Sequence, residues 1–203
     1  MKTEIQYTEK GYKIIAGVDE AGRGPIAGPV VAGACILPLD FNHPLITDSK
    51  KITEKKRDEY FDIIKSEALS WAVGIIEPKE IDEINILQAT HKAMRLAIEG
   101  LNVLPDIALV DGLPVKGLPC EHNAIVKGDA LVKSISCASI LAKVTRDRIM
   151  IELGEKYPEY NFQKHKGYGT KEHIEAIKKH GPCPAHRLTF EPIRSMESTL
   201  YLF

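Results

Sequence analysis

Four acidic residues share one sequence context, which is the end of an apolar run beside glycine or another small residue. They are Asp19, Glu20, Asp111 and Asp129. Carboxylate oxygens are the ligands that hard divalent cations prefer, and magnesium needs few of them because it keeps several waters. Two such ions about 3.5–4 Å apart activate a water and stabilise the leaving oxygen in phosphodiester hydrolysis. The pattern therefore predicts a two-metal site.

Asp19 and Glu20 are adjacent at the end of an apolar run, where burial is costly unless a cation or hydrogen-bond donors compensate the charges. Consecutive residues of a strand point to opposite faces of the sheet. We therefore expect Asp19 to be central, and Glu20 to reach in where the strand gives way to the loop at Gly22. The alternative is that the acids cap turns and helices, which is common for one acid but not for four together.

Asp147 is the main competitor of Asp129 for the role of fourth carboxylate. It lies inside a predicted helix, four residues after Lys143. Oppositely charged side chains at this spacing are neighbours on a helix surface. We therefore predict an ion pair between Lys143 and Asp147, and we assign the metal site to Asp129.

Residues suited to binding a polyanion accompany the acids. The turn Gly22-Arg23-Gly24 could bring backbone amides and one guanidinium close to a sugar-phosphate, although a tight hairpin also explains its glycines. Tyr168 stands between glycines and could stack on a sugar or base, although most such tyrosines are simply packed. Further candidates for phosphate contacts, each with a solvated surface charge as its alternative, are Lys50, Lys127, Lys133 and Lys143.

The elements that must position these residues follow from hydrophobic periodicity. Short apolar runs bounded by Gly and Pro predict buried strands. They cover residues 14–18, 29–37, 71–76, 106–110 and 124–126. Helical spacing predicts helices over 54–69, 86–101 and 134–157, and a last helix that stops at Gly181-Pro182, followed by an irregular tail over 184–194.

Within the predicted helices, the apolar stripes should face the core. We expect Leu69, Leu87, Met94 and Ile151 to be among the buried positions. The small residues 136–139 should let the third helix approach the sheet closely. Strands first, then strands alternating with helices, predict a mixed α/β sheet with helices on both faces. Carboxylates at the C-terminal ends of separate strands converge in one crevice of such a sheet.

Composition narrows the class of protein. The chain has 203 residues, which suits one domain with a small appendage, and a net charge of −1. The charge is uneven, because residues 126–194 carry 13 Lys/Arg and 8 Asp/Glu, whereas the remainder carries 14 and 20. An acidic part with carboxylates and a basic part with cations suits a protein that binds metal and a polyanion. Random scatter over a solvated surface is the alternative.

The sequence also bears on the cellular compartment of the protein and on the redox state of its cysteines. No apolar stretch approaches the roughly 18 residues of a membrane span, and the first residues do not resemble a signal peptide. The four cysteines lie far apart without a C-x-x-C pair. We therefore expect a cytoplasmic protein that does not associate with membranes, with reduced thiols packed in the core.

Seven motifs resemble, in order, those of the type 2 ribonuclease H family. The first is Asp19-Glu20-Ala21-Gly22-Arg23-Gly24-Pro25. The others are Asp48-Ser49-Lys50-Lys51, Val110-Asp111-Gly112, Lys127-Gly128-Asp129, the segment 138–147, His165-Lys166-Gly167-Tyr168-Gly169-Thr170 and His186-Arg187-Leu188-Thr189-Phe190. Together they span nearly the whole chain from Ile14 to Arg194. Within the family, the chain is most similar to bacterial ribonuclease HII.

The resemblance implies an RNase H-like mixed β-sheet flanked by helices, with a catalytic domain over residues 1–157 and a substrate-contacting C-terminal helical extension over 158–203. It implies Mg²⁺- or Mn²⁺-dependent cleavage of RNA in RNA–DNA hybrids by a monomer. It also implies incision 5′ to single ribonucleotides in duplex DNA, which leaves 3′-hydroxyl and 5′-phosphate ends. The catalytic, metal-binding acids of the family carry over onto Asp19, Glu20, Asp111 and Asp129. The substrate-binding residues that we assign are Gly22, Arg23, Gly24, Lys50, Lys143 and Tyr168.

Two other classes of function compete with this interpretation. A non-catalytic module that binds RNA–DNA hybrids would need the basic part of the chain but not four convergent acids. A phosphotransferase would need a glycine-rich loop for nucleotide phosphates after a strand, and the sequence has no P-loop pattern. Metal-dependent cleavage separates the first alternative from the nuclease.

Overall fold

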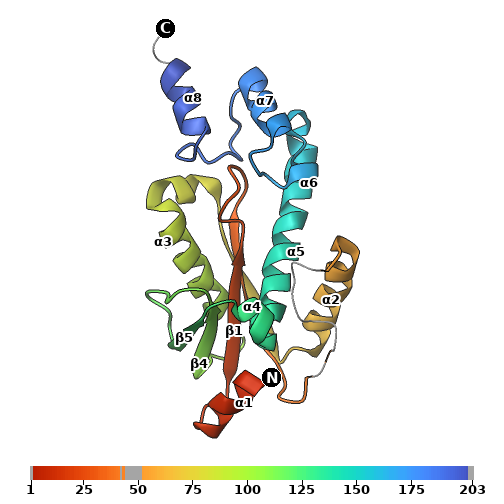
Figure 1. Cartoon of the computed structure of the whole chain (residues 1–203), viewed down its shortest axis with the longest axis vertical. Helices are drawn as coiled ribbons and strands as arrows, with labels where there is room; N and C mark the ends of the chain where they lie inside the picture. Colours follow the sequence, from red (N-terminus) through yellow and green to blue (C-terminus); the bar gives the residue numbers. More distant parts are fainter. Residues whose placement is uncertain (1, 42, 44–51, 201–203) are drawn as a thin grey trace.

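The computed structural model describes residues 2–41, 43 and 52–200. Its centre is a five-stranded sheet in the order β3-β2-β1-β4-β5 (Figure 1). The strands are β1 (Ile15–Ala21), β2 (Val30–Ile36), β3 (Ser70–Ile76), β4 (Ile107–Asp111) and β5 (Glu121–Ile125). The pairs β1–β2 and β2–β3 are antiparallel, whereas β1–β4 and β4–β5 are parallel. The predicted mixed sheet is therefore confirmed.

The parallel pairing of β1 with β4 brings two of the acids to one edge of the sheet. Val18 pairs with Val110, and the next residue of each strand is an aspartate, Asp19 on β1 and Asp111 on β4. Both strands run in the same direction, so both carboxylates stand near the same end of the sheet. This edge is the crevice in which open α/β sheets place their sites.

Helices cover both faces of the sheet, as predicted. The helices are α1 (Lys2–Glu9), α2 (Glu54–Glu67), α3 (Pro78–Glu99), α4 (Gly128–Leu131), α5 (Lys133–Lys156), α6 (Phe162–His165), α7 (Lys171–His180) and α8 (Ile193–Leu200), with a 3-10 turn, η1, at Pro158–Tyr160. Buried residues of α3, including Met94, pack with β1, β2 and β4 in one core cluster. A second cluster joins α2 and α5 to β2 on the other face.

Helix α5 lies unusually close to the sheet, which explains two glycines. A Cβ atom at Gly17 of β1 would lie 2.0 Å from the carbonyl carbon of Ser134, and one at Gly33 of β2 would lie 2.3 Å from the carbonyl oxygen of Ala138. Real Cβ atoms do not approach other atoms so closely. The small residues at 136–139 therefore have the role that the sequence predicts.

The C-terminal helices α6–α8 gather at one end of the molecule, and α1 lies at the other (Figure 1). The loop between β1 and β2 reaches the C-terminal part, where Ile26 and Ala27 share a core cluster with Phe162 and Ile193. The sequence predicted neither α1 nor α8. Its last predicted helix, α7, does end at Gly181.

Four positions expected in the core are exposed. Val126, predicted in a buried strand, is 68% exposed because β5 ends at Ile125. Leu69 is 66% exposed because α2 ends at Glu67, so this residue lies beyond the helix. Leu87 is 48% exposed because α3 already begins at Pro78 and is kinked at Asn85 (φ 66°, ψ 163°), which changes the face that follows. Ile151 is 39% exposed, while its neighbour Met150 is the residue that packs against the C-terminal cluster.

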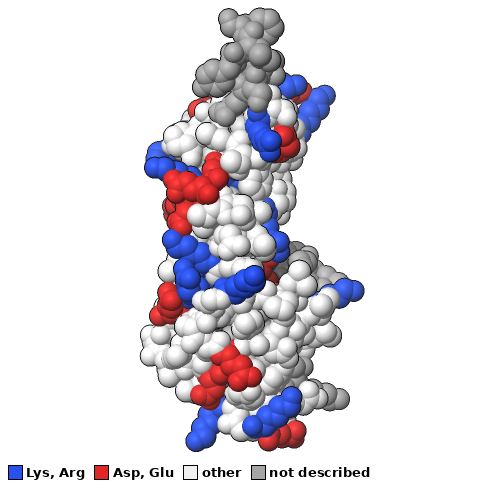
Figure 2. Space-filling view, turned by 90° about the vertical axis from the view of Figure 1, so that its left-hand side faces the viewer, with Lys and Arg blue, Asp and Glu red and all other residues white. Residues whose placement is uncertain are grey.

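The surface carries both signs of charge in groups. On the face that Figure 2 views, Lys and Arg gather at mid-height, with acidic side chains above and below them. All four cysteines are free thiols, and Cys35 and Cys137 are buried, as expected of core packing. Within the part of the chain described above, no helix is long and apolar enough to cross a bilayer.

Candidate functional site

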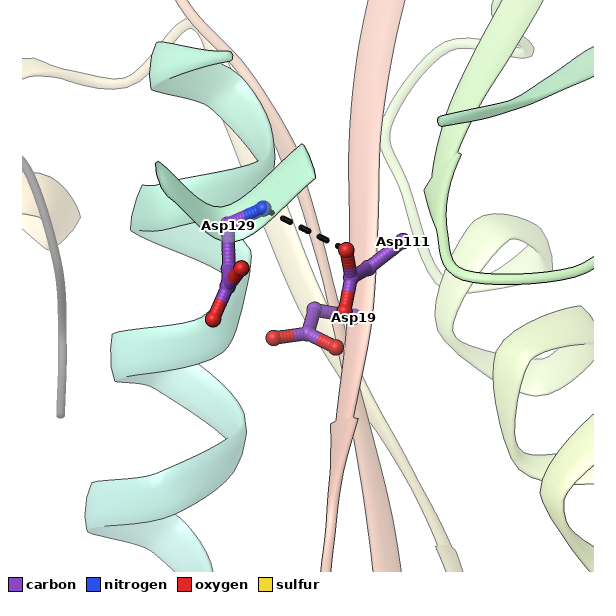
Figure 3. Close-up of side chains that lie close together, drawn as sticks. All are labelled: Asp19, Asp111 and Asp129. Carbon is purple, nitrogen blue, oxygen red and sulfur yellow. Dashed lines mark hydrogen bonds between the residues drawn. The ribbon is translucent and has the colours of Figure 1, made fainter. Parts of the chain in front are cut away.

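Three of the four predicted acids converge at the edge of the sheet. Asp19, Asp111 and Asp129 each place a carboxylate oxygen within 4.8 Å of the others (Figure 3). Asp19 comes from β1, Asp111 from the end of β4 and Asp129 from α4. Residues from three separate parts of the sequence thus form one group of oxygen donors.

Asp111 orders the segment that carries Asp129. One oxygen of Asp111, Oδ1, accepts a hydrogen bond from the Gly128 amide at 2.6 Å. It accepts another from the Asp129 amide at 3.4 Å (Figure 3). The chain turns into α4 at Lys127, which has left-handed backbone angles (φ 57°, ψ 36°). The sequence placed Asp129 just beyond a short strand, and the structure places it in the first turn of a helix that Asp111 caps.

The carboxylate of Asp19 is held in an environment that disfavours its charge. Its residue is only 5% exposed. Burial, and then the neighbouring charges of Glu20 and Asp111, raise the pKa of Asp19 well above its ordinary value, although a hydrogen bond with Ser139 partly opposes the shift. The three carboxylates offer only oxygen donors and repel one another when they are ionised. A hard divalent cation fits such a group, because it would neutralise the negative charges that burial disfavours.

Glu20 lies beside this group rather than within it. Strand β1 continues through Glu20 to Ala21 and gives way to the loop at Gly22, so Glu20 stands near this strand end, as expected. Its Oε1 accepts a hydrogen bond from Nη1 of Arg23 at 3.2 Å. Burial raises the pKa of Glu20, and the Arg23 charge opposes that shift. Glu20 nevertheless lines the same cavity as Asp19 and Asp111.

This cavity has a volume of about 400 Å³. Its described lining consists of Asp19, Glu20, Ala21, Gly22, Arg57, Asp111, Ser139, Lys143, Arg146 and Tyr168. The cavity therefore brings together Asp19, Glu20 and Asp111 with one end of the glycine turn and the predicted tyrosine. The lining combines carboxylates for cations with basic side chains for phosphate, which is the combination that a phosphodiester substrate with its metal ions needs.

The remaining predicted substrate residues are placed around the cavity in different ways. A Cβ atom at Gly24 would lie 3.8 Å from Cε1 of Tyr168, so this glycine lies close to the tyrosine ring. Lys143 Nζ donates to Asp147 at 2.7 Å, which confirms the predicted ion pair. Lys127 and Lys133 are not part of the described lining. Lys50 and its motif lie outside the described residues.

Two buried arginines hold the segment 22–29, which we call the glycine loop. Arg187, fully buried, donates to the carbonyl oxygens of Gly22, Arg23, Pro25 and Gly28 at distances of 2.6–3.1 Å. Arg146, 1% exposed, donates to those of Ala27, Pro29 and Lys166 at 3.0 Å. The two buried guanidinium groups therefore fix the backbone conformation of the glycine loop.

Sequence reasoning missed both arginines as determinants of the site, together with Ser139. Arg146 lies within the motif segment 138–147 and Arg187 within the last motif, but the sequence alone assigns neither a role. A signal was present at Arg146, because it stands in a helix between residues that face the core, where an unpaired charge would be costly. Its partners lie more than 100 residues away or beyond the helix, so they could not be named from the sequence.

The sequence of this chain is similar to those of known proteins over most of its length. The Ribonuclease HII family model matches residues 16–193. A ribonuclease HII of Acetivibrio thermocellus is 58% identical over 187 residues, which are 92% of this chain and 73% of the relative. One of Endomicrobium trichonymphae is 54% identical over 193 residues, 95% of this chain and 92% of the relative.

The chain belongs to the ribonuclease HII family. It is therefore a ribonuclease H, an endonuclease of a divalent-metal-dependent family, and the predicted family is confirmed. The acidic group of this ribonuclease supplies the oxygen donors that such metal ions need.

Solved structures show the same fold. The crystal structure of the ribonuclease H2 from Pyrococcus horikoshii OT3 matches with a TM-score of 0.79 and 29% identity, over 93% of this chain and 99% of that chain. The structure of the PCNA:RNase HII complex from Archaeoglobus fulgidus matches with a TM-score of 0.74 and 25% identity, over 88% and 96% of the two chains. The predicted RNase H-like sheet flanked by helices is thus confirmed.

Proposed function

We propose that this ribonuclease H hydrolyses the RNA strand of RNA–DNA hybrids and also incises 5′ to single ribonucleotides embedded in duplex DNA. The products carry 3′-hydroxyl and 5′-phosphate ends. The observation that carries the proposal is that Asp19 and Asp111 of the three-carboxylate group line one cavity together with Glu20, Gly22 and Tyr168. We further propose a monomer that acts in the cytoplasm, with substrate contacts from residues 158–203.

The carboxylates of Asp19, Asp111 and Asp129 would hold Mg²⁺ or Mn²⁺, and Glu20 stands beside them. When bound, a pair of such ions activates the attacking water and stabilises the leaving 3′ oxygen. The chain itself supplies fixed geometry, because β1 and β4 belong to one rigid sheet and Asp111 caps the helix of Asp129. All four acids are assigned here as catalytic residues.

A single ribonucleotide differs from its neighbours by one 2′-hydroxyl, which the enzyme must contact to find it. Arg187 occupies the carbonyl oxygens of Gly22 and Arg23 from the buried side. The amides of this turn are then the backbone groups that are left to hydrogen-bond the 2′-hydroxyl beside the acids. Tyr168, 51% exposed, can stack on the next sugar, where a deoxyribose fits and a hydroxyl would crowd the ring.

The test uses a DNA duplex with one internal ribonucleotide, labelled at the 5′ end of the modified strand. We expect one cut on the 5′ side of the ribonucleotide in the presence of Mg²⁺ or Mn²⁺. The shortened strand should be extended by a DNA polymerase without prior treatment, which requires a 3′-hydroxyl. Cleavage only within continuous hybrids would contradict the proposed incision. Binding without cleavage in either metal would instead favour a hybrid-binding module.

Replacing Tyr168 with alanine separates the two substrates. Stacking of a ring on a nucleotide is worth roughly 1–3 kcal/mol, so kcat/KM on the single-ribonucleotide duplex should fall by about one to two orders of magnitude. The loss on a continuous hybrid should be smaller, since that substrate has no RNA-to-DNA junction to be read.

The control is Tyr168→Phe, which keeps the ring and should behave nearly as the wild type. Equal losses of the alanine variant on the two substrates would make Tyr168 a general binding residue. Junction reading would then need another explanation.

A further inference from the structure

A group of three histidines lies behind the loop that carries Tyr168. His173 is fully buried, His186 is 2% exposed and His165 is 9% exposed. The rings of His165 and His173 are stacked with their centroids 4.3 Å apart, and Phe162 packs edge-on against both. None of the three lines the catalytic cavity, and the metal group does not include them.

Their hydrogen bonds form a chain that ends on Tyr168. The Cys183 amide donates to Nδ1 of His186 at 2.9 Å. Nε2 of His186 lies 3.0 Å from Nε2 of His173, whose Nδ1 lies 2.9 Å from the carbonyl oxygen of Tyr168. The chain thus links the loop before the last motif to the backbone of the tyrosine.

The positions of the protons follow from the two ends of this chain. A carbonyl oxygen only accepts, so the proton of His173 must be on Nδ1, and its Nε2 is then an acceptor. His186 must therefore carry its proton on Nε2 and donate it to His173. That tautomer leaves Nδ1 of His186 free to accept from Cys183, which is the bond observed. The Tyr168 end therefore fixes both neutral tautomers, and the Cys183 end is compatible with them, since Nδ1 of His186 lies 2.9 Å from the amide nitrogen of Cys183 and 3.2 Å from its carbonyl oxygen.

Burial keeps the two rings neutral. Burial first, and the nearby His165 in addition, lower the pKa of His173 and that of His186 to about 4 in each case. Backbone contacts, of His173 with Tyr168 and of His186 with Cys183, act in the opposite direction. Both histidines of this hydrogen-bond chain, which we call the relay, are therefore neutral throughout the neutral pH range.

The loop of Tyr168 has further anchors, all of them on its backbone. Its amide donates to the carbonyl oxygen of His165 at 3.0 Å, and its carbonyl also accepts from the Thr170 amide at 2.8 Å. The preceding Gly167 accepts from the amide of Ile26 in the glycine loop at 2.9 Å. Since half of the Tyr168 residue is exposed, the direction of its ring depends on how firmly its backbone is held.

We infer that His173 is a positioning residue for Tyr168, held in the Nδ1–H tautomer by His186, and that it aims the tyrosine ring over the catalytic cavity. This inference rests on the proposed role of Tyr168 at the junction. His173 touches neither substrate nor metal site. It acts through the carbonyl of Tyr168.

Nitrogen-15 NMR of the imidazole rings of the intact wild-type protein at pH 7 tests the relay without any cleavage. We expect His173 as the Nδ1–H tautomer, with Nε2 unprotonated, and His186 as the Nε2–H tautomer. The Nε2–H form is the commoner one for free histidine, so the result for His173 is specific. Finding His173 as Nε2–H, or as an imidazolium, would overturn the inference.

A matched pair of variants tests the consequence for catalysis. His173→Asn places an amide N–H near the former Nδ1 and can still donate to Tyr168, whereas His173→Gln places it near the former Nε2. Because a small misplacement of a positioning group can cost up to about 100-fold in rate, we expect His173→Gln to lower the single-ribonucleotide to hybrid ratio of kcat/KM by about ten-fold. His173→Asn should lower this ratio by less than about three-fold.

The control on the same helix is His180→Gln, which replaces an exposed histidine and should leave the ratio unchanged. All variants are compared at equal folded fraction, checked by thermal unfolding. Equal ratios for His173→Asn and His173→Gln would overturn the inference. Tyr168→Ala is measured in parallel to test the proposed role of Tyr168 separately. If kcat/KM of this variant falls equally on both substrates, Tyr168 does not read the junction. The tautomers of His173 and His186 then still decide whether the relay exists.

Discussion

Replacing Asp19 with asparagine should abolish cleavage and, in the absence of metal, raise the stability of the protein. Asparagine has nearly the same shape and keeps an oxygen for the Glu20 amide, which donates to Asp19 at 2.7 Å. It removes a buried negative charge that faces Glu20 and Asp111. Metal ions supply several kcal/mol of transition-state stabilisation, so the loss in turnover should be at least about three orders of magnitude.

The stability gain of this variant has a defined dependence on pH. The pKa of Asp19 is raised in the folded protein. Ionisation of this carboxyl group therefore destabilises the metal-free wild type when the pH rises above about 4, which is the ordinary pKa of an aspartate. The asparagine variant cannot ionise at this position. Its advantage in melting temperature should therefore increase with pH, and a gain of about 1 kcal/mol corresponds to about 2–4 °C in a domain of this size.

The matched control is Asp58→Asn, because the Asp58 side chain is 48% exposed and is paired with Arg148. It should keep full activity and change stability little, since exposed ion pairs contribute about 0–1 kcal/mol. Ordinary turnover by Asp19→Asn at saturating Mg²⁺ would refute the metal assignment. A lower melting temperature for this variant would show instead that Asp19 is a structural acid.

Asp129→Asn and Asp147→Asn should differ by orders of magnitude in turnover. Asp129 contributes an oxygen to the group with Asp19 and Asp111, whereas Asp147 is held by Lys143 at 2.7 Å on α5. Loss of one carboxylate from the metal group should lower kcat by about two to three orders of magnitude. Asp147→Asn frees Lys143 but leaves the metal donors in place, so we expect a change of less than about five-fold.

Single-turnover cleavage of a continuous hybrid at saturating enzyme measures this difference without a contribution from product release. Thermal unfolding of both variants shows whether either one is impaired in folding. If Asp147→Asn were the more damaging change, Asp147 rather than Asp129 would be the fourth acid. Equal losses would mean that Lys143 and its partner belong to the reacting group.

The parts of the fold that could be predicted depend on local patterns. The hairpin β1–β2, the strands β3 and β4 and the helix α5 each carry a periodicity that is visible within a few turns of chain. Asp19 and Asp111 could be grouped because parallel strands deliver their C-terminal ends to one edge of the sheet. The pairing of Lys143 with Asp147 follows from helix geometry alone and needs no tertiary information.

The parts that were missed depend on distant contacts. Arg187 binds carbonyl oxygens 159–165 residues earlier in the chain, so its role is visible only in three dimensions. Helix α4 begins at a left-handed lysine, and its first turn is capped by Asp111 from another strand. The kink at Asn85 changes which face of α3 is buried, and a regular period of 3.6 residues cannot anticipate it.

The central claim is that Asp19, Asp111 and Asp129 hold the divalent ions on which cleavage depends. The most direct measurement is a Mn²⁺ titration of metal-free wild type and Asp19→Asn, which records the melting temperature and the cleavage of a single-ribonucleotide duplex at each concentration. A ligand at 100 times its Kd stabilises the folded state by about 2.7 kcal/mol. The wild type should therefore become more stable and active over the same range of Mn²⁺, while the variant shows neither change. Cleavage by metal-free wild type, or equal stabilisation of the variant by Mn²⁺, would contradict the claim.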